Sequence, residues 1–184
     1  MPYAVAHILV PIILVALFRD FYLKSRDRKE FPLHYVLLAG LGGVLPDIDL
    51  PISVVLNFLG FASWNVHKTF THSLLFPVIF LLLFLVLLPV HKKARICNLT
   101  RHKLKLSIIF LIVAIGSLIH IFLDALVGGQ AFFFYPFSIH DYGLYLTEYL
   151  PKELQALSLP LLDGIFLVIW IAYLEVKHKI SDFI

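Results

Sequence analysis

Histidine and carboxylate side chains recur in closely spaced pairs along this apolar sequence. The pairs are Asp47 and Asp49, His67 and His72, and His120 and Asp124. Imidazole and carboxylate groups together are the ligands that zinc and harder divalent metals prefer in proteins. We therefore expect the three pairs to meet at one end of the folded chain and to hold metal there.

The pair formed by His120 and Asp124 carries the strongest signal. The two residues are four apart, so they share one face of a helix, in a run that is otherwise apolar. Ionisable residues within a membrane span are costly and usually functional, although a buried pair that only supports packing is the alternative. The other pairs also have simpler explanations. Acids beside a proline can cap a helix, and polar residues in a loop need no special cause.

Two isolated polar residues are further candidates. His7 lies in the first apolar run and Asp163 near the start of the last one. A histidine is tolerated at the membrane interface, and an acid at a helix N-terminus is favoured by the helix dipole. Both alternatives stay open.

The composition indicates a membrane protein. Of the 184 residues, 60% are hydrophobic, and the mean hydropathy is +0.92. An ordinary soluble domain is only ~45–50% apolar. The length fits a single domain over residues 1–184. The net charge of +3 comes from basic residues in short loops, so we expect membrane topology, and no nucleic-acid partner, to explain it.

Five apolar runs have lengths typical of membrane-spanning helices, so the predicted fold is an all-α polytopic bundle. The runs are residues 3–18, 32–45, 73–90, 106–127 and 160–176. Pro46 should end or kink the second span, because proline interrupts the helical hydrogen bonds. Near the same point, Gly40, Gly42 and Gly43 should let a neighbouring helix approach closely.

Two connections between the spans are themselves apolar. Residues 51–61 are too short to span a membrane, so we expect an interfacial or re-entrant helix there. Residues 130–156 are rich in Phe and Tyr, which favour the membrane–water interface.

The basic residues predict the orientation. Lys and Arg number five in the loop after the first span, six after the third and two in the C-terminal tail, against one in each other loop. The positive-inside rule then places the N-terminus outside. All the candidate ligands fall at the outer ends of the spans. His34, 13 residues before Asp47, belongs to the inner end, roughly 20 Å away at ~1.5 Å per residue.

Several motifs follow one another along nearly the whole chain. They are Ala6-His7, Leu45-Pro46-Asp47-Ile48-Asp49, His67-Lys68 with Thr71-His72-Ser73, His120-x-x-x-Asp124, Tyr135-Pro136-Phe137 and Leu162-Asp163-Gly164. In this order they resemble the YdjM-like family of membrane-bound metal-dependent hydrolases. The family often has Thr where Ala6 stands and Arg where Lys68 stands, and lysine is a less directional anion donor than arginine.

The resemblance implies a metal centre that hydrolyses a phosphoester. The family is distantly similar to zinc-dependent phospholipases C and single-strand nucleases. One to three divalent ions, which we expect to be zinc, would activate water and stabilise phosphoryl oxygens. The expected metal ligands are His7, Asp47, Asp49, His67, His72, His120 and Asp124, and the expected catalytic residues are Asp49, Asp124 and Lys68.

A site at the outer interface of the plasma membrane favours a lipid or lipid-linked substrate, with residues 130–156 as a lid or a lipid entry. Two other classes of function stay open. A metal-binding transporter or channel would need polar residues along the bundle, and the first, third and fifth spans offer almost none. A non-catalytic interaction protein that keeps a structural metal is the third reading.

The orientation can be tested with a membrane-impermeant thiol reagent after Cys97 has been replaced. A single cysteine at Asn65 should label from outside, and one at Asn98 only after the membrane is opened, because the basic loops are predicted to be cytoplasmic. The reverse pattern would refute the predicted topology.

Overall fold

A computed structural model of the chain describes residues 4–60, 69–90, 104–127 and 131–179. All the regular structure in these ranges is helical. The α-helices are α1 Ala4–Leu17, α2 Ser25–Glu30, α3 Leu33–Val44, α4 Asp49–Phe58, α5 Leu75–Val90, α6 Leu106–Val127 and α7 Lys152–His178. A π-helical turn, Phe18–Tyr22, extends α1, and two 3-10 turns are Leu45–Ile48 and Leu146–Tyr149.

Four helical stretches are long and apolar enough to cross a membrane. Within the part of the chain that the structure describes, they are Ala4–Tyr22, Leu33–Phe58, Leu106–Val127 and Lys152–Lys177. The predicted all-helical membrane bundle is confirmed, with one difference in length. Helix α5 has 16 residues, or ~24 Å, and so falls short of a hydrocarbon core of ~30 Å.

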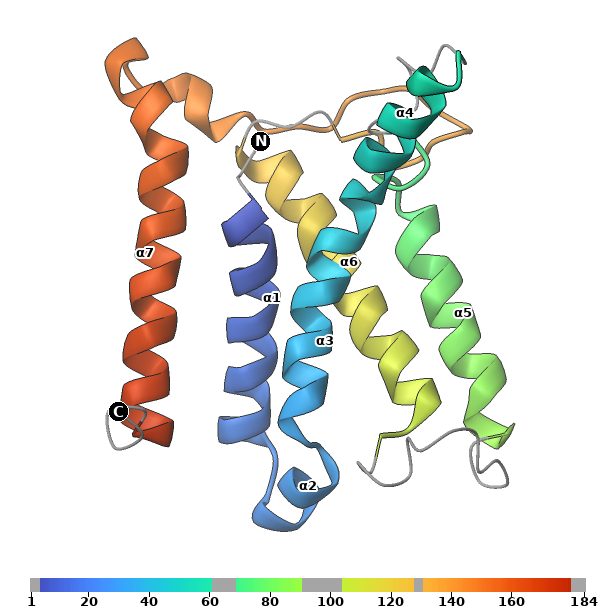
Figure 1. Cartoon of the computed structure of the whole chain (residues 1–184), viewed down its shortest axis with the longest axis vertical. Helices are drawn as coiled ribbons and strands as arrows, with labels where there is room; N and C mark the ends of the chain where they lie inside the picture. Colours follow the sequence, from blue (N-terminus) through green and yellow to red (C-terminus); the bar gives the residue numbers. More distant parts are fainter. Residues whose placement is uncertain (1–3, 61–68, 91–103, 128–130, 180–184) are drawn as a thin grey trace.

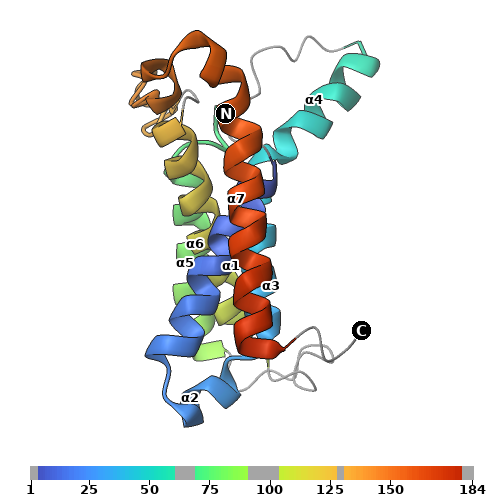
Figure 2. The same cartoon turned by 90° about the vertical axis from the view of Figure 1, so that its left-hand side faces the viewer.

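The helices α1, α3 and α6 form the centre of the bundle, and α5 lies beside α6 (Figure 1). The buried core joins these three central helices through Ile12, Tyr35, Ala39 and Ile112, among others. Helix α7 stands at the edge next to α1, and none of its span is buried (Figure 1). Helix α4 leans away from the bundle (Figure 2).

Proline interrupts the second span where the sequence predicts, since the α-helix α3 ends at Val44 and α4 leans away beyond the turn (Figure 2). Pro46 is the second residue of the 3-10 turn that follows α3, and the helical run continues through that turn into α4. A proline near the start of a helical turn costs little, because the first N–H groups of a turn have no partner within it. Helix α4 occupies the place of the expected short helix at 51–61.

The last span begins earlier than expected. Helix α7 starts at Lys152 rather than at 160, and Pro160 lies inside it. The residues between these two points include Glu, Leu, Gln and Ala, which are good helix formers and therefore extend the helix toward its N-terminus. The aromatic connection is correspondingly shorter than the expected 130–156.

Glycines bring the three central helices into close contact. A Cβ atom on Gly42 would lie 2.8 Å from the carbonyl oxygen of Val113, and one on Gly43 would overlap the carbonyl oxygen of His7. Gly116 of α6, which the sequence analysis did not single out, faces the Ala39 carbonyl in the same way. The expected close approach at the glycines of α3 is therefore present, toward α1 and α6 at once.

Hydrogen bonds join the connection over residues 131–151 to the start of α5 and to the end of α6. The N–H of Leu74 donates to the Phe133 carbonyl at 2.9 Å, and the N–H of Leu144 donates to the Ala125 carbonyl at 2.6 Å. The hydroxyl of Thr147 donates to the Val127 carbonyl at 2.7 Å. These bonds hold the start of α5 and the end of α6 in fixed relation.

The tight glycine contact predicts a specific loss of stability. Gly43→Ala should lower the free energy of unfolding by about 1–3 kcal/mol, since the added methyl group must push α1 away from α3. The measurement is thermal unfolding in detergent. Gly164→Ala is the matched control, because nothing lies within 4 Å of a Cβ atom at Gly164. Equal destabilisation by both changes would contradict the role of the contact.

Candidate metal centre

Five candidate ligands converge at one end of the bundle. His7 lies in the first turn of α1, Asp47 in the 3-10 turn after α3, His72 just before α5, and His120 and Asp124 in the last two turns of α6. Four of the residues are at most 2% exposed, whereas the side chain of Asp47 is 21% exposed. The group is therefore buried, with one side open at Asp47.

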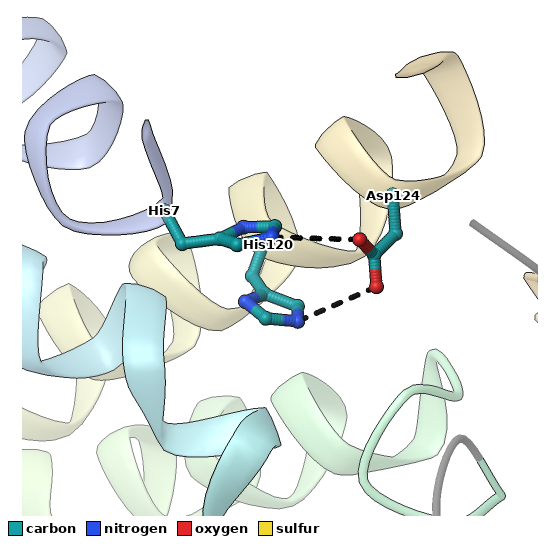
Figure 3. Close-up of side chains that lie close together, drawn as sticks. All are labelled: His7, His120 and Asp124. Carbon is teal, nitrogen blue, oxygen red and sulfur yellow. Dashed lines mark ion pairs between the residues drawn. The ribbon is translucent and has the colours of Figure 1, made fainter. Parts of the chain in front are cut away.

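The first subset of the cluster joins α1 to α6. The Nε2 atom of His7 lies 3.4 Å from Oδ1 of Asp124, and the Nε2 atom of His120 lies 3.6 Å from Oδ2 of the same carboxylate (Figure 3). The rings of His7 and His120 are stacked, with their centroids 3.9 Å apart. Asp124 thus presents one oxygen to each imidazole.

The second subset joins the turn after α3 to the start of α5. The Nε2 atom of His72 lies 3.3 Å from Oδ1 of Asp47, and the Nε2 atom of His120 lies 3.7 Å from the same oxygen. The Nε2 atoms of His72 and His120 are 3.2 Å apart. His120 is shared, and the ligand atoms within each subset all lie within 4.8 Å of one another.

The donor set fits a divalent cation. Both oxygens of Asp124 are buried and have no hydrogen-bond partner among the described residues. A buried carboxylate that accepts no hydrogen bond is costly even beside the imidazoles of His7 and His120, and a cation among these groups would lower that cost. Two nitrogens at ~2.0–2.1 Å from one tetrahedral zinc would lie roughly 3.3 Å apart, close to the spacing of His72 and His120.

A backbone carbonyl sets the tautomer of His120. Nδ1 of His120 lies 2.6 Å from the carbonyl oxygen of Gly43, in the last turn of α3. A carbonyl can only accept, so Nδ1 carries the proton and Nε2 presents its lone pair to the cluster. Ser117, one turn earlier on α6, donates to the Gly42 carbonyl at 3.0 Å. Ser117 is not among the residues predicted from the sequence, although a polar residue in an apolar span is a usable signal.

Asp49 contacts Nδ1 of His72, whereas the other members of the cluster gather around Nε2 of that ring. Its Oδ2 atom accepts from the Thr71 hydroxyl at 2.9 Å and lies 3.5 Å from Nδ1 of His72. The Thr71 oxygen is itself 3.1 Å from that nitrogen. The sequence predicts that Asp49 is a metal ligand. In the structure Asp49 and Thr71 both contact the side of the His72 ring opposite Nε2.

Three carboxylates surround His72 and favour its protonated form. Burial opposes the charge, but hydrogen bonding to Asp47 and Asp49 and the charge of Asp124 raise the pKa of His72 to about 9. The metal-free site therefore holds a proton among these acids. A divalent cation would take the place of that proton, so binding it would release the proton.

The other predicted residues fall in different places. His67 and Lys68 lie outside the described residues. His34 is exposed in the first turn of α3, at the opposite end of that helix from Asp47. Asp163 lies about three turns into α7, so the idea that it is an N-terminal acid of its own helix is wrong. Its Oδ1 atom instead accepts a hydrogen bond from the N–H of Ala6 at 2.9 Å, beside His7.

The shared position of His120 predicts its effect on metal binding. His120→Ala should lower the metal content of the purified protein at least twofold, because both subsets of ligands lose a nitrogen. His34→Ala is the matched control and should leave the metal content unchanged. Elemental analysis of both variants, each checked for folding by circular dichroism, makes the measurement. Equal metal loss would place the metal elsewhere.

Comparison with known proteins identifies the family. The family model described as YdjM inner membrane protein matches residues 1–179. No curated protein and no solved structure matches the chain. The family match covers all five candidate ligands of the cluster and every described helix, α7 included. With its apolar helices and its buried histidine–aspartate cluster, the chain belongs to the YdjM family of inner membrane proteins.

Proposed function

We propose that this protein is a membrane-bound metal-dependent hydrolase that cleaves a phosphoester of a lipid or lipid-linked substrate. One observation carries the proposal. Three histidines and two aspartates meet at one end of the spans, and the buried carboxylate of Asp124 has no hydrogen-bond partner among the described residues. Such a set is suited to binding a cation that a purely structural bundle would not need.

The described ligands suit one ion or a bridged pair. A bound divalent ion, which we propose to be zinc, lowers the pKa of water and neutralises charge on phosphoryl oxygens. Nε2 of His120 has a single lone pair, so it can serve one ion only. The ring of His7 stacks on that of His120, whereas the Nε2 atom of His72 lies 3.2 Å from that of His120. A second oxygen of Asp47 or Asp124 would be available to a second ion.

The remaining residues would orient the ligands and the substrate. Asp47, the exposed member of the cluster, marks the side from which a substrate would approach. Asp49 and Thr71 would hold the ring of His72, and the Gly43 carbonyl would hold that of His120. We also propose that Lys68 contacts a phosphoryl oxygen and offsets its charge.

The position of the cluster supports a lipid substrate. It lies where α1 begins and α6 ends, next to the connection over residues 131–151. In that connection Phe133 stacks on Tyr142, and it packs edge-on against Phe122 of α6. Aromatic groups of this kind prefer the headgroup region, where the phosphoester of a lipid also lies. The distribution of basic loops favours the outer side.

The direct experiment measures phosphodiester hydrolysis by the purified protein before and after chelation. Asp124→Asn should abolish turnover even in excess metal, because a ligand is lost. Asp49→Asn should lower metal affinity about 10–100-fold, as is usual for a residue that orients a ligand, and excess metal should restore turnover. Glu153→Gln on the exposed start of α7 is the matched control and should leave activity unchanged.

Two outcomes would decide against this mechanism. A metal-dependent activity that persists in Asp124→Asn would remove that carboxylate from the reaction. A folded, metal-loaded parent protein that hydrolyses no phosphoester, carboxylic ester or amide would favour a non-catalytic role for the metal.

A further inference from the structure

One carboxylate gathers three hydrogen bonds in the connection over residues 131–151. The Oδ1 atom of Asp141 accepts from the N–H groups of Ala131 and Gly143, each at 3.0 Å. The Oδ2 atom of the same side chain accepts from the hydroxyl of Tyr145. An ionised carboxylate forms stronger hydrogen bonds than a neutral acceptor does. Asp141 therefore closes this stretch of the connection into one bonded loop.

The first of these bonds lies close to the segment that carries His72. Ala131 stands two residues before Phe133, whose carbonyl accepts from the N–H of Leu74 at 2.9 Å. Leu74 in turn lies two residues after His72. Ala131 is 1% exposed, and its carbonyl accepts from the N–H of Tyr142 at 3.1 Å. Both polar backbone groups of Ala131 are thus bonded, so the part of the connection that contacts the His72 segment is fixed.

The second bond lies close to the segment that carries Asp124. Leu144 directly follows Gly143, and its N–H donates to the Ala125 carbonyl at 2.6 Å. Ala125 directly follows Asp124 near the end of α6. The carboxylate of Asp141 therefore fixes backbone that is bonded, one or two residues farther along, to each of the two segments.

The two segments need such a contact at this end of the bundle. The Nε2 atom of His72 lies 3.6 Å from Oδ2 of Asp124. Figure 1 shows α5 and α6 farther apart at this end than at the other, with the connection passing across both. We propose that Asp141 is a positioning residue of the metal centre, which holds His72 against Asp124 through the backbone of the connection. This inference rests on the metal site of the proposed function and is independent of the substrate.

Three substitutions separate the hydrogen bonds of Asp141 from its charge. Asp141→Ala removes both oxygens. Asp141→Asn keeps a carbonyl oxygen for the two N–H groups, and its amide can donate to the Tyr145 oxygen. Glu148→Ala is the matched control, because Glu148 is an exposed acid of the same connection. Each full-length protein is stripped of metal and titrated with Co²⁺, whose visible absorption bands report both binding and coordination geometry.

We expect Asp141→Ala to bind Co²⁺ about tenfold more weakly than the parent protein and to shift the absorption bands, as is usual when a residue that orients a ligand is lost. Asp141→Asn and Glu148→Ala should keep the affinity and the bands of the parent. Parental affinity and bands in Asp141→Ala would show that this carboxylate serves the loop alone, and would overturn the inference while leaving the proposed function intact. A loss in Asp141→Asn equal to that in Asp141→Ala would assign the effect to charge and would overturn it as well.

Tyr145→Phe decides the question if circular dichroism shows that Asp141→Ala does not fold. This change removes the bond to Oδ2 and leaves both N–H bonds to Oδ1 in place. Co²⁺ binding that is weakened a few-fold supports the inference, and unchanged binding overturns it. A folded parent protein that binds neither Co²⁺ nor Zn²⁺ would overturn the proposed function and this inference together.

Discussion

The close contact of α3 with α1 and α6 determines where His7 and His120 of the cluster lie. Without a side chain at Gly43, the backbone of α1 comes near enough to α3 for His7 to stack on His120. The same approach brings His120 within hydrogen-bond distance of the Gly43 carbonyl. In a membrane, helices gain little from the hydrophobic effect and associate largely through such close packing. Packing and ligand geometry therefore depend on one contact.

The sequence predicts the helices that carry the ligands better than it predicts how the ligands are used. The span over 106–127 and the shared face of His120 and Asp124 follow from apolar length and helical spacing, and α6 has those bounds. The roles of Asp47 and Asp49 do not follow in the same way. Asp47 lies in the 3-10 turn and Asp49 begins α4, and their carboxylates point to different nitrogens of His72. No sequence period specifies which nitrogen each one meets.

Contacts between distant parts of the chain were the least predictable. The bond from Ala6 to Asp163 joins residues 157 positions apart, and it replaces the local explanation that the sequence offered for that acid. Composition indicates where apolar runs lie, but it does not specify which residues of distant segments meet.

The bond between Asp163 and Ala6 gives α7 an importance that its exposed surface conceals. Helix α7 supplies no residue of the cluster, and none of its span is buried. Yet its carboxylate receives one of the first N–H groups of α1, which has no partner within its own helix. In hydrocarbon an unpaired N–H costs several kcal/mol. Helix α7 thus fixes the position of His7 along the axis of the bundle. A truncated chain without α7 would keep all five candidate ligands and lose their alignment.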